Sequence, residues 1–384
     1  MGGPAHHVTL LSGLLDPDRY ETLLLHGEVG AGEASLEAMA EVRGAHHETV
    51  PGLRPELRPT DDLRALWTLI RKVRAFRPDI VHTHTAKAGL LGRLAAVLGG
   101  RPRPRIVHTY HGHVLEGYFG PLKNGFYRTL ERLLARLSDV LIGVSTATVD
   151  DLVRLRVAPR QKFRVIPIGL DLDPFLASDG ENSPFRGAAG ATDHEVLLTW
   201  VGRLVPIKRV DVLLRAMAHA RAQGAPVRLA IVGDGEERPA LEQLADELGI
   251  TAYISFMGYR ADMVEVASAS DLAVLSSDNE GTPVSLIEAA AAGAAAVATR
   301  VGGVADVVTP ETGILVPAGD SRALGEAVTA LATDPAKRRA MGQAARDCVR
   351  TRFSIARLLE DVERLYEDLM QDPTHAGNLT PRAR

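Results

Sequence analysis

Two glutamates lie on either side of a predicted helix start in the segment DNEGTPVSLIEAAAAG. Glu280 precedes a Gly-Thr-Pro turn, and Glu288 lies on the helix that follows. Thr282 is a typical N-cap, Pro283 suits the first helical position, and Val284 opens an apolar run. A helix start offers unpaired N–H groups to phosphate or sugar oxygens, and carboxylates accept hydrogen bonds from sugar or ribose hydroxyls. The alternative is a helix start with two solvated acids.

Two cations follow the strand that ends at Gly202 in the segment WVGRLVPIKR. Arg203 can contact a phosphate through two parallel N–H groups, while Lys208 acts as a point charge beyond a proline turn. This pair of cations at a strand-to-helix turn therefore suits a diphosphate group.

Two more turns after predicted strands contain glycines that would let a ligand approach the backbone. In IVGDGEERPA, Gly233 and Gly235 fit a dinucleotide-binding fingerprint, but Arg238 stands where the third glycine should be. We therefore do not predict a nicotinamide cofactor. In FMGYRAD, the backbone around Gly258 and Tyr259 is predicted to meet a nucleobase.

Alternating strand and helix patterns along the whole chain predict an α/β protein with parallel sheets. Helical stretches separate the strand candidates in both halves, so we expect two Rossmann-like, doubly wound domains that face each other across a cleft. Ligands are expected at the carboxyl ends of the strands. The strand candidates are residues 20–25, 46–50, 80–83, 105–109, 140–144 and 163–166, then 196–201, 228–232, 253–256, 272–275, 296–299 and 314–316.

The domain boundary is predicted near residue 175, because residues 178–193 are rich in Gly, Ser, Ala, Asn and Asp and show no periodicity. We expect a first domain over 1–175 and a second over 176–353. A helix over 354–370 is expected to cross back to the first domain, and 371–384 to form a disordered tail.

The chain opens with a Gly2-Gly3 turn and a helix, an arrangement that normally follows the first strand of a doubly wound domain. We therefore expect the first strand to be missing from this sequence. The hypothesis is that the natural polypeptide is longer at its start by about ten residues, a strand and a turn. The intact mass of the protein from its native cell tests this, and a mass that matches a start at Met1 would refute it.

The composition indicates a globular protein: 46% of the 384 residues are hydrophobic and 24% are charged. The single cysteine, Cys348, excludes a disulfide framework and favours a reducing, cytoplasmic location. No apolar run reaches the length of a membrane span, and no signal peptide is recognisable.

The charge is unevenly distributed between the halves. Residues 1–175 carry 23 Lys and Arg against 19 Asp and Glu, while the rest carry 21 against 29. Arg128, Arg132 and Arg136 lie on a predicted helix with leucines between them. Such a basic amphipathic helix can lie on an anionic membrane or hold an acidic acceptor. The alternative is an ordinary surface helix with its leucines in the core.

The motifs together resemble the retaining glycosyltransferases of family 4, which have two Rossmann-like domains in the GT-B arrangement. The resemblance covers nearly the whole chain. It rests on GGPAHHVTLLSGL, VHTHTAKAGLLGRLAA, HTYHGHVLEGYFGPLK, VGRLVPIKR, VGDGEERPAL, FMGYRADM, SSDNEGTPVSLIEAAAAG and VGGVADVV.

The resemblance implies a role for each of the two glutamates. Glu280 is implied to hold hydroxyls of the transferred sugar, and Glu288 the ribose of the nucleotide. Arg203 and Lys208 are implied to neutralise the pyrophosphate. The N–H groups of the turn at the helix start are implied to cradle sugar and phosphate, within a donor site formed by Gly2, Gly3, Gly202, Gly233, Gly258, Tyr259, Gly281, Thr282, Pro283 and Val284.

The first half contributes two further candidates. His111, in the segment YHGH, matches the family histidine that contacts the donor sugar, although a lone histidine is more often a packing residue. Lys87 is a candidate acceptor or phosphate contact. No metal or other cofactor is expected, since no cysteine or acidic cluster accompanies the histidine pairs His82 with His84 and His111 with His113.

The predicted activity is transfer of a hexosyl group from a nucleotide sugar, with a UDP-sugar favoured over GDP-mannose. Retention is expected by front-face substitution, rather than by the double displacement that two carboxylates can support. The expected acceptor is a lipid-linked or polysaccharide glycan, with peripheral contact to an anionic membrane at its inner face and no nucleic acid partner. The alternatives are a nucleotide-sugar epimerase or phosphorylase on the same fold and a non-catalytic nucleotide-sugar binder.

Overall fold

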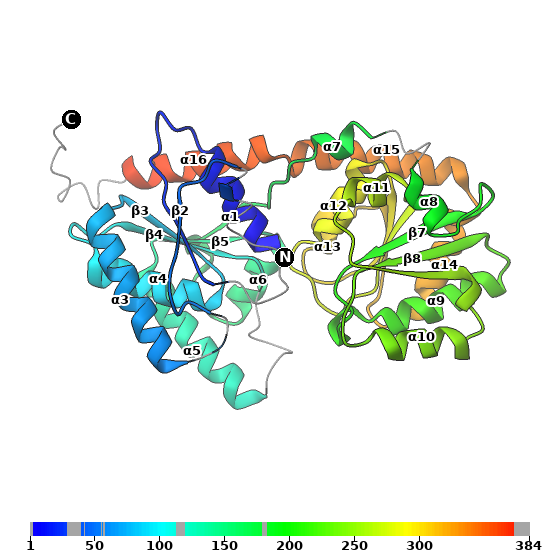
Figure 1. The fold of residues 1–384 in the computed structure, drawn as a ribbon, viewed down its shortest axis with the longest axis horizontal. Coiled ribbons are helices and arrows are strands. Elements are labelled where there is room, and N and C mark those ends of the chain that lie inside the picture. The colour runs from blue at the N-terminus through cyan, green and yellow to red at the C-terminus, as the bar shows by residue number, and fades with distance from the viewer. Residues whose placement is uncertain are drawn as a thin grey trace. The chain divides into compact units, whose positions relative to one another are not determined.

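The computed structural model describes residues 3–28, 40–41, 43–54, 56, 58–112, 120–178 and 183–371. The chain forms two compact units (Figure 1). The first consists of Met1–Gly169 and Ile355–Arg384, and the second of Leu170–Ser354. Every named strand pairs in parallel with its neighbours. The expected α/β class, with parallel sheets in two domains, is confirmed.

The described strands of the first unit form two sheets rather than one. A two-stranded sheet pairs β1 with β2, and a four-stranded sheet has the order β3-β4-β5-β6. Each predicted strand of this half is present, although β1 begins later than expected. The strands are β1 (Leu24–His26), β2 (His47–Thr49), β3 (Ile80–His84), β4 (Arg105–Tyr110), β5 (Val140–Gly143) and β6 (Phe163–Val165).

Helices cover both faces of the four-stranded sheet. On one face, Leu11 and Leu358 pack with the strand residues Val107 and Ile142. The helices of this unit are α1 (Gly3–Leu14), α3 (Pro59–Phe76), α4 (Ala86–Gly99), α5 (Pro121–Leu137), α6 (Thr146–Arg154) and α16 (Ile355–Gln371), with a 3-10 turn, η1 (Arg160–Lys162). On the other face, residues of α5 and α6 pack against β4 and β5. Helix α16 thus completes the first unit.

The leucines of the basic helix α5 are not all in the core. Leu134 is 2% exposed, whereas Leu133 is 52% exposed. The expectation of an ordinary surface helix with buried leucines is therefore only partly correct.

The second unit contains one six-stranded sheet in the order β12-β11-β10-β7-β8-β9. All six predicted strands are present, with bounds within two residues of those expected. They are β7 (Val196–Val201), β8 (Val227–Val232), β9 (Ile254–Gly258), β10 (Leu272–Leu275), β11 (Ala295–Thr299) and β12 (Gly313–Val316). From β7 the chain adds β8 and β9 on one side. It then crosses to the other side of β7 and adds β10, β11 and β12 there.

Alternation along the strands explains why helices cover both faces of this sheet. Leu198 and Trp200 of β7 pack with α9, α10 and α14, while Leu197 faces α8 and α11 (Figure 1). The helices are α7 (Asp173–Leu176), α8 (Pro184–Ala188), α9 (Val210–Ala222), α10 (Arg238–Glu247), α11 (Met263–Ser268), α12 (Val284–Ala291), α13 (Val304–Val307), α14 (Ser321–Ala332) and α15 (Pro335–Arg352). Short 3-10 turns are η2 (Pro206–Lys208) and η3 (Thr251–Tyr253).

Helix length and hydropathy bear on the membrane question. None of the helices within the described residues combines the length and apolar character that crossing a bilayer requires.

Candidate functional site

The strand order of the second unit reverses between β7 and β10, which are neighbours in the sheet. In open parallel sheets, ligands bind where the order reverses, beyond the carboxyl ends of the two strands. The loop after β7 contains Arg203 and Lys208, and the loop after β10 contains Glu280. The topology therefore explains why predicted residues more than seventy positions apart, Lys208 and Glu280, come together.

Lys208 and Glu280 form an ion pair, in which Nζ donates to Oε1 at 2.6 Å. The hydroxyl of Ser277 donates to the same oxygen at 2.7 Å. Only 10% of the Glu280 side chain and 25% of the Lys208 side chain are exposed. Among the described residues, none donates a hydrogen bond to the second carboxylate oxygen of Glu280. That oxygen is therefore available to a hydroxyl of a ligand.

Backbone and side-chain hydrogen bonds hold the two loops together. The N–H of Asp278 donates to the carbonyl of Ile207 at 2.9 Å, and the hydroxyl of Ser276 donates to the carbonyl of Lys208 at 3.0 Å. These bonds fix the lysine relative to the loop that carries the glutamate. The ion pair is thus part of an ordered loop pair and not an isolated surface contact.

A third loop, after β11, supports the turn that contains Glu280. Gly302 has a φ of +45°, and a Cβ at this position would lie 1.8 Å from the carbonyl oxygen of Glu280. The N–H of Gly303 donates to the carbonyl of Gly281 at 2.9 Å. Only glycine permits this close approach of the two backbones. Gly302 was not among the predicted site residues, although two consecutive glycines after a strand were a usable signal.

The helix start at the turn differs from the prediction. Pro283 is the N-cap of α12, with φ −76° and ψ 97°, and the helix begins at Val284. Pro283 has no polar side-chain atom with which to cap this end. The prediction of Thr282 as N-cap and Pro283 as first helical residue was wrong by one position, because Pro283 takes an extended ψ. The N–H groups at the start of α12 still point out of the helix end.

Three of the predicted glycines lie together at the carboxyl ends of neighbouring strands. Gly202, Gly233 and Gly258 follow or end β7, β8 and β9. The N–H of Gly233 donates to the carbonyl of Gly258 at 2.8 Å, and a Cβ on Gly233 would lie 1.8 Å from the carbonyl oxygen of Gly202. The three turns therefore pack backbone against backbone.

Two predicted donor-site residues extend into solvent. Arg203 is exposed, and its guanidinium forms no hydrogen bond or ion pair with the described residues. Tyr259 is 72% exposed, although its aromatic ring is largely apolar. Both side chains are accessible to a ligand, but the structure does not bring either into contact with Lys208 or Glu280.

Glu288 lies on α12, on the face of the helix that is turned toward the sheet. It lines a small hollow together with Thr199 of β7, Met263 of α11 and Ser285 of α12. Burial raises the pKa of the Glu288 carboxyl to about 7. A carboxyl group with this pKa can accept or donate a hydrogen bond near neutral pH.

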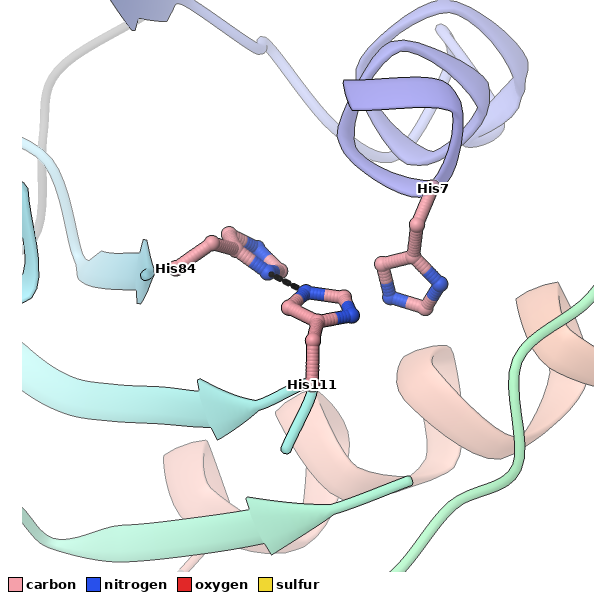
Figure 2. Close-up of side chains that lie close together, drawn as sticks. All are labelled: His7, His84 and His111. Carbon is pink, nitrogen blue, oxygen red and sulfur yellow. Dashed lines mark hydrogen bonds between the residues drawn. The ribbon is translucent and has the colours of Figure 1, made fainter. Parts of the chain in front are cut away.

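His111 follows β4 in the first unit, within a group of histidines (Figure 2). Its Nε2 lies 3.0 Å from Nδ1 of His84, and its ring meets that of His7 edge-on with 5.0 Å between centroids. Burial lowers the pKa of His111 to about 4. The imidazole is therefore neutral near pH 7. His7 and His84 were not predicted as neighbours of His111, because only the fold brings these segments together.

The remaining candidates of the first unit have different surroundings. Lys87 forms an ion pair with Asp62 at 2.5 Å and donates to the carbonyl of Glu56. Its ammonium group is thus already paired. Gly3 is the first residue of α1, whereas Gly2 lies outside the described residues, as does His113.

Comparison with known proteins identifies the family. Residues 1–174 match the model of Glycosyltransferase Family 4, and residues 183–347 match that of Glycosyl transferases group 1. EpsD of Bacillus subtilis (strain 168) is 30% identical over 318 residues, which cover 81% of this chain and 82% of EpsD. The UDP-Gal:alpha-D-GlcNAc-diphosphoundecaprenol alpha-1,3-galactosyltransferase of Escherichia coli is 27% identical over 325 residues, 84% of this chain and 83% of the enzyme.

The fold is similar to that of Alr3699/HepE of Anabaena, whose crystal structures contain UDP or UDP-glucose. The UDP complex has a TM-score of 0.80 at 21% sequence identity, with 96% of each chain covered. This similarity shows that the chain has the GT-B fold. The two family models and the likeness to EpsD show that the chain is a glycosyltransferase and belongs to glycosyltransferase family 4.

Proposed function

We propose that the protein transfers a hexosyl group from a UDP-sugar to a lipid-linked or polysaccharide glycan, with retention of the anomeric configuration. The observation that carries this proposal is the pair of Lys208 and Glu280 at the reversal point of the second sheet, beside the start of α12. The UDP and UDP-glucose complexes of the Anabaena protein support the choice of nucleotide. The reaction is proposed to occur in the cytoplasm.

The ion pair suits a donor that carries both a diphosphate and hydroxyl groups. An ammonium group has three N–H donors, and Glu280 uses one of those of Lys208. Within the described part of the chain the other two have no acceptor, and in the proposal they bind the pyrophosphate. Negative charge builds up on the leaving nucleotide as the anomeric bond breaks, and a positioned cation stabilises that charge. Lys208, Arg203 and the N–H groups of α12 supply this stabilisation in the proposal, which needs no metal ion.

Glu280 has a separate role in the proposal. One of its oxygens accepts hydrogen bonds from Lys208 and Ser277, and the other accepts a hydroxyl of the transferred sugar. Two strong donors on one carboxylate reduce its nucleophilicity, which favours front-face substitution over a glycosyl-enzyme intermediate. Mass spectrometry of wild type and Glu280→Gln after incubation with donor tests this. A covalent glycosyl adduct on the wild type that is absent from the variant would refute front-face substitution.

The nucleoside and the sugar are assigned to the remaining predicted residues. Glu288 binds the ribose from the wall of its hollow, Tyr259 and Gly258 meet the base, and His111 contacts the transferred sugar, as the family resemblance implies. A neutral His111 donates one hydrogen bond and accepts another. Lys87 is the proposed acceptor contact, and this role requires it to leave Asp62.

A thermal-shift screen with nucleotides tests the donor proposal. A ligand that binds only the folded protein raises its melting temperature. We expect UDP and UDP-sugars to raise it more than GDP and GDP-mannose do. A larger shift with GDP-mannose, or no shift with any nucleotide diphosphate, would contradict the proposed donor. Incubation with donor alone distinguishes transfer from epimerisation, since an epimerase would change the sugar without an acceptor.

The acceptor is proposed to be a lipid diphosphate glycan at the inner membrane face. The Escherichia coli relative is named for an acceptor of this kind. Helices α3, α4 and α5 of the first unit together carry most of the large apolar side chains that are exposed among the described residues. These are Leu63, Trp67, Leu98, Leu122, Phe126 and Leu133.

Helix α5 combines exposed apolar and basic residues on one surface. Leu122, Phe126 and Leu133 are 92%, 66% and 52% exposed, and their spacing of four and seven residues puts them on one face of the helix. Lys123 and Arg136 are also exposed. Apolar side chains bounded by cations suit an anionic lipid surface.

Vesicle sedimentation tests this membrane contact. We expect the protein to bind vesicles that contain phosphatidylglycerol at low salt, and the double variant Leu122→Ser with Phe126→Ser to bind at least about tenfold more weakly. Leu14→Ser is a matched control, because Leu14 is exposed on another helix. Equal binding of the double variant and the control would refute a role for α5.

A further inference from the structure

The geometry points to a transition-metal site formed by His7, His84 and His111 (Figure 2). One ring nitrogen of each histidine lies within 4.8 Å of those of the other two. Nitrogen ligands at about 2.0–2.1 Å from a zinc ion in a tetrahedral site are about 3.3 Å from each other. Nδ1 of His84 and Nε2 of His111 are 3.0 Å apart. Two of the three ligand atoms therefore already have nearly the required spacing.

His7 supplies the third nitrogen. Its side chain is 3% exposed, and its Nδ1 is buried without a hydrogen-bond partner among the described residues. The ring points from α1 toward the other two, with centroids 5.6 Å from His84 and 5.0 Å from His111 (Figure 2). A buried polar atom without a partner is unfavourable, and coordination of a metal ion would satisfy it. The ligand nitrogen of His7 lies within 4.8 Å of those of the other two histidines, and binding requires it to move to about 3.3 Å from them.

The three ligands come from three separate elements that the fold holds in place. His7 lies on α1, His84 ends β3, and His111 follows β4, which pairs with β3. The pairing of His84 with Thr109 in the sheet fixes the distance between the last two ligands. His82 stacks on His84 with 4.4 Å between centroids, and it is held by Tyr366 and Thr109 at 2.7 Å each. These neighbours restrict the orientation of the His84 ring.

The ligand chemistry selects the class of metal ion. Three imidazoles without thiolate or carboxylate suit Zn²⁺, Co²⁺, Ni²⁺ or Cu²⁺, whereas Mg²⁺ and Ca²⁺ prefer oxygen ligands. Each imidazole binds a metal ion through a ring nitrogen that carries no proton, so zinc binding competes with protonation. Three protein ligands leave a fourth position open to water or a small anion.

Metal binding has a consequence for transfer that rests on the proposed function. His111 is the proposed contact to the donor sugar, and a metal ion would occupy its Nε2. The site is therefore an inhibitory one: bound Zn²⁺ withdraws His111 from the donor. This site is separate from the donor-binding residues of the second unit, which need no metal.

Cobalt absorption spectroscopy and zinc equilibrium dialysis on the full chain test the site without relying on enzyme activity. We expect one Zn²⁺ per chain, and visible Co²⁺ absorption bands typical of tetrahedral coordination. His7→Gln should weaken zinc binding at least about 100-fold, since even residues that only support metal ligands contribute 10–100-fold. His47→Gln is the matched control. It removes a different histidine pair, His26 with His47, whose ring nitrogens are 3.2 Å apart.

Two outcomes would overturn the proposal. One is the absence of stoichiometric Zn²⁺ or tetrahedral Co²⁺ bands in the wild-type protein, which needs no variant and is independent of folding defects. The other is zinc binding that His7→Gln and His84→Gln leave unchanged while circular dichroism shows both to be folded. In a transfer assay, zinc should inhibit the wild type and His47→Gln but not His7→Gln. A protein that binds zinc at this site and shows no transferase activity would refute the proposed function alone.

Discussion

Replacing Glu288 with glutamine should change how the stability of the second unit depends on pH. Burial raises the pKa of this carboxyl from 4.5 to about 7. The folded state therefore binds the proton more tightly than the unfolded chain does. The stabilisation that results is fully present below pH 4.5 and is lost as the pH rises through 7.

The magnitude follows from the two pKa values. One pKa unit corresponds to about 1.4 kcal/mol, so Glu288 contributes about 2.5 kcal/mol to the free energy of unfolding at pH 5 and almost nothing at pH 8. Glutamine has the shape of the protonated acid but does not titrate. Between pH 5 and pH 8 the wild type should therefore lose about 2.5 kcal/mol more stability than Glu288→Gln does.

Tryptophan fluorescence during urea unfolding measures this difference in stability for the second unit of the chain. The chain has two tryptophans. Trp200 is 1% exposed in the second unit, while Trp67 of the first unit is 63% exposed and should change little on unfolding. Glu236→Gln is a control, because Glu236 is exposed on a loop of the same unit. Parallel pH profiles of wild type and Glu288→Gln, within about 0.5 kcal/mol, would refute the reasoning from burial.

Two further substitutions test the packing that supports the candidate residues. Gly302→Ala should destabilise the loop that carries Glu280 by about 1–3 kcal/mol and reduce transfer, since the new Cβ would clash with the Glu280 carbonyl. Gly319→Ala, at a φ of +76° with open space around it, is the control for backbone strain alone; equal losses would contradict the clash. Arg93→Met should destabilise the first unit by about 3–5 kcal/mol, because it leaves Glu131 buried without its ion pair at 3.2 Å. Removing Glu131 as well should restore part of the loss in urea unfolding followed by circular dichroism, and no recovery would argue against the ion pair as the cause.

The strands were predictable from the sequence because they follow local patterns. Buried parallel strands read as short β-branched runs, and all twelve expected strands are present in the structure. The helix start at Pro283 was misplaced by one residue, because the N-cap preference of Thr282 did not determine the local backbone. Tertiary contacts act on this turn, including the contact of the Gly302 loop with Glu280, and the residues of the turn itself give no indication of them.

The candidate residues were predictable one by one, but several of their contacts were not. Lys208 and Glu280 were assigned to different parts of a donor, and their ion pair depends on the order of β7 and β10 in the sheet. The contacts of His111 with His7 and His84 likewise depend on the pairing of β3 with β4 and on the position of α1. Such contacts between distant segments have no periodicity in the sequence.

Calorimetric titration of UDP tests the central claim most directly, namely that Lys208 at the reversal point of the second sheet binds the nucleotide diphosphate. We expect UDP to bind the wild type and Lys208→Met to weaken binding at least about tenfold, because the variant loses a charge-assisted hydrogen bond. Lys337→Met, at the start of α15, is the control and should bind UDP as the wild type does. UDP affinity that is the same in Lys208→Met as in the wild type would contradict the account.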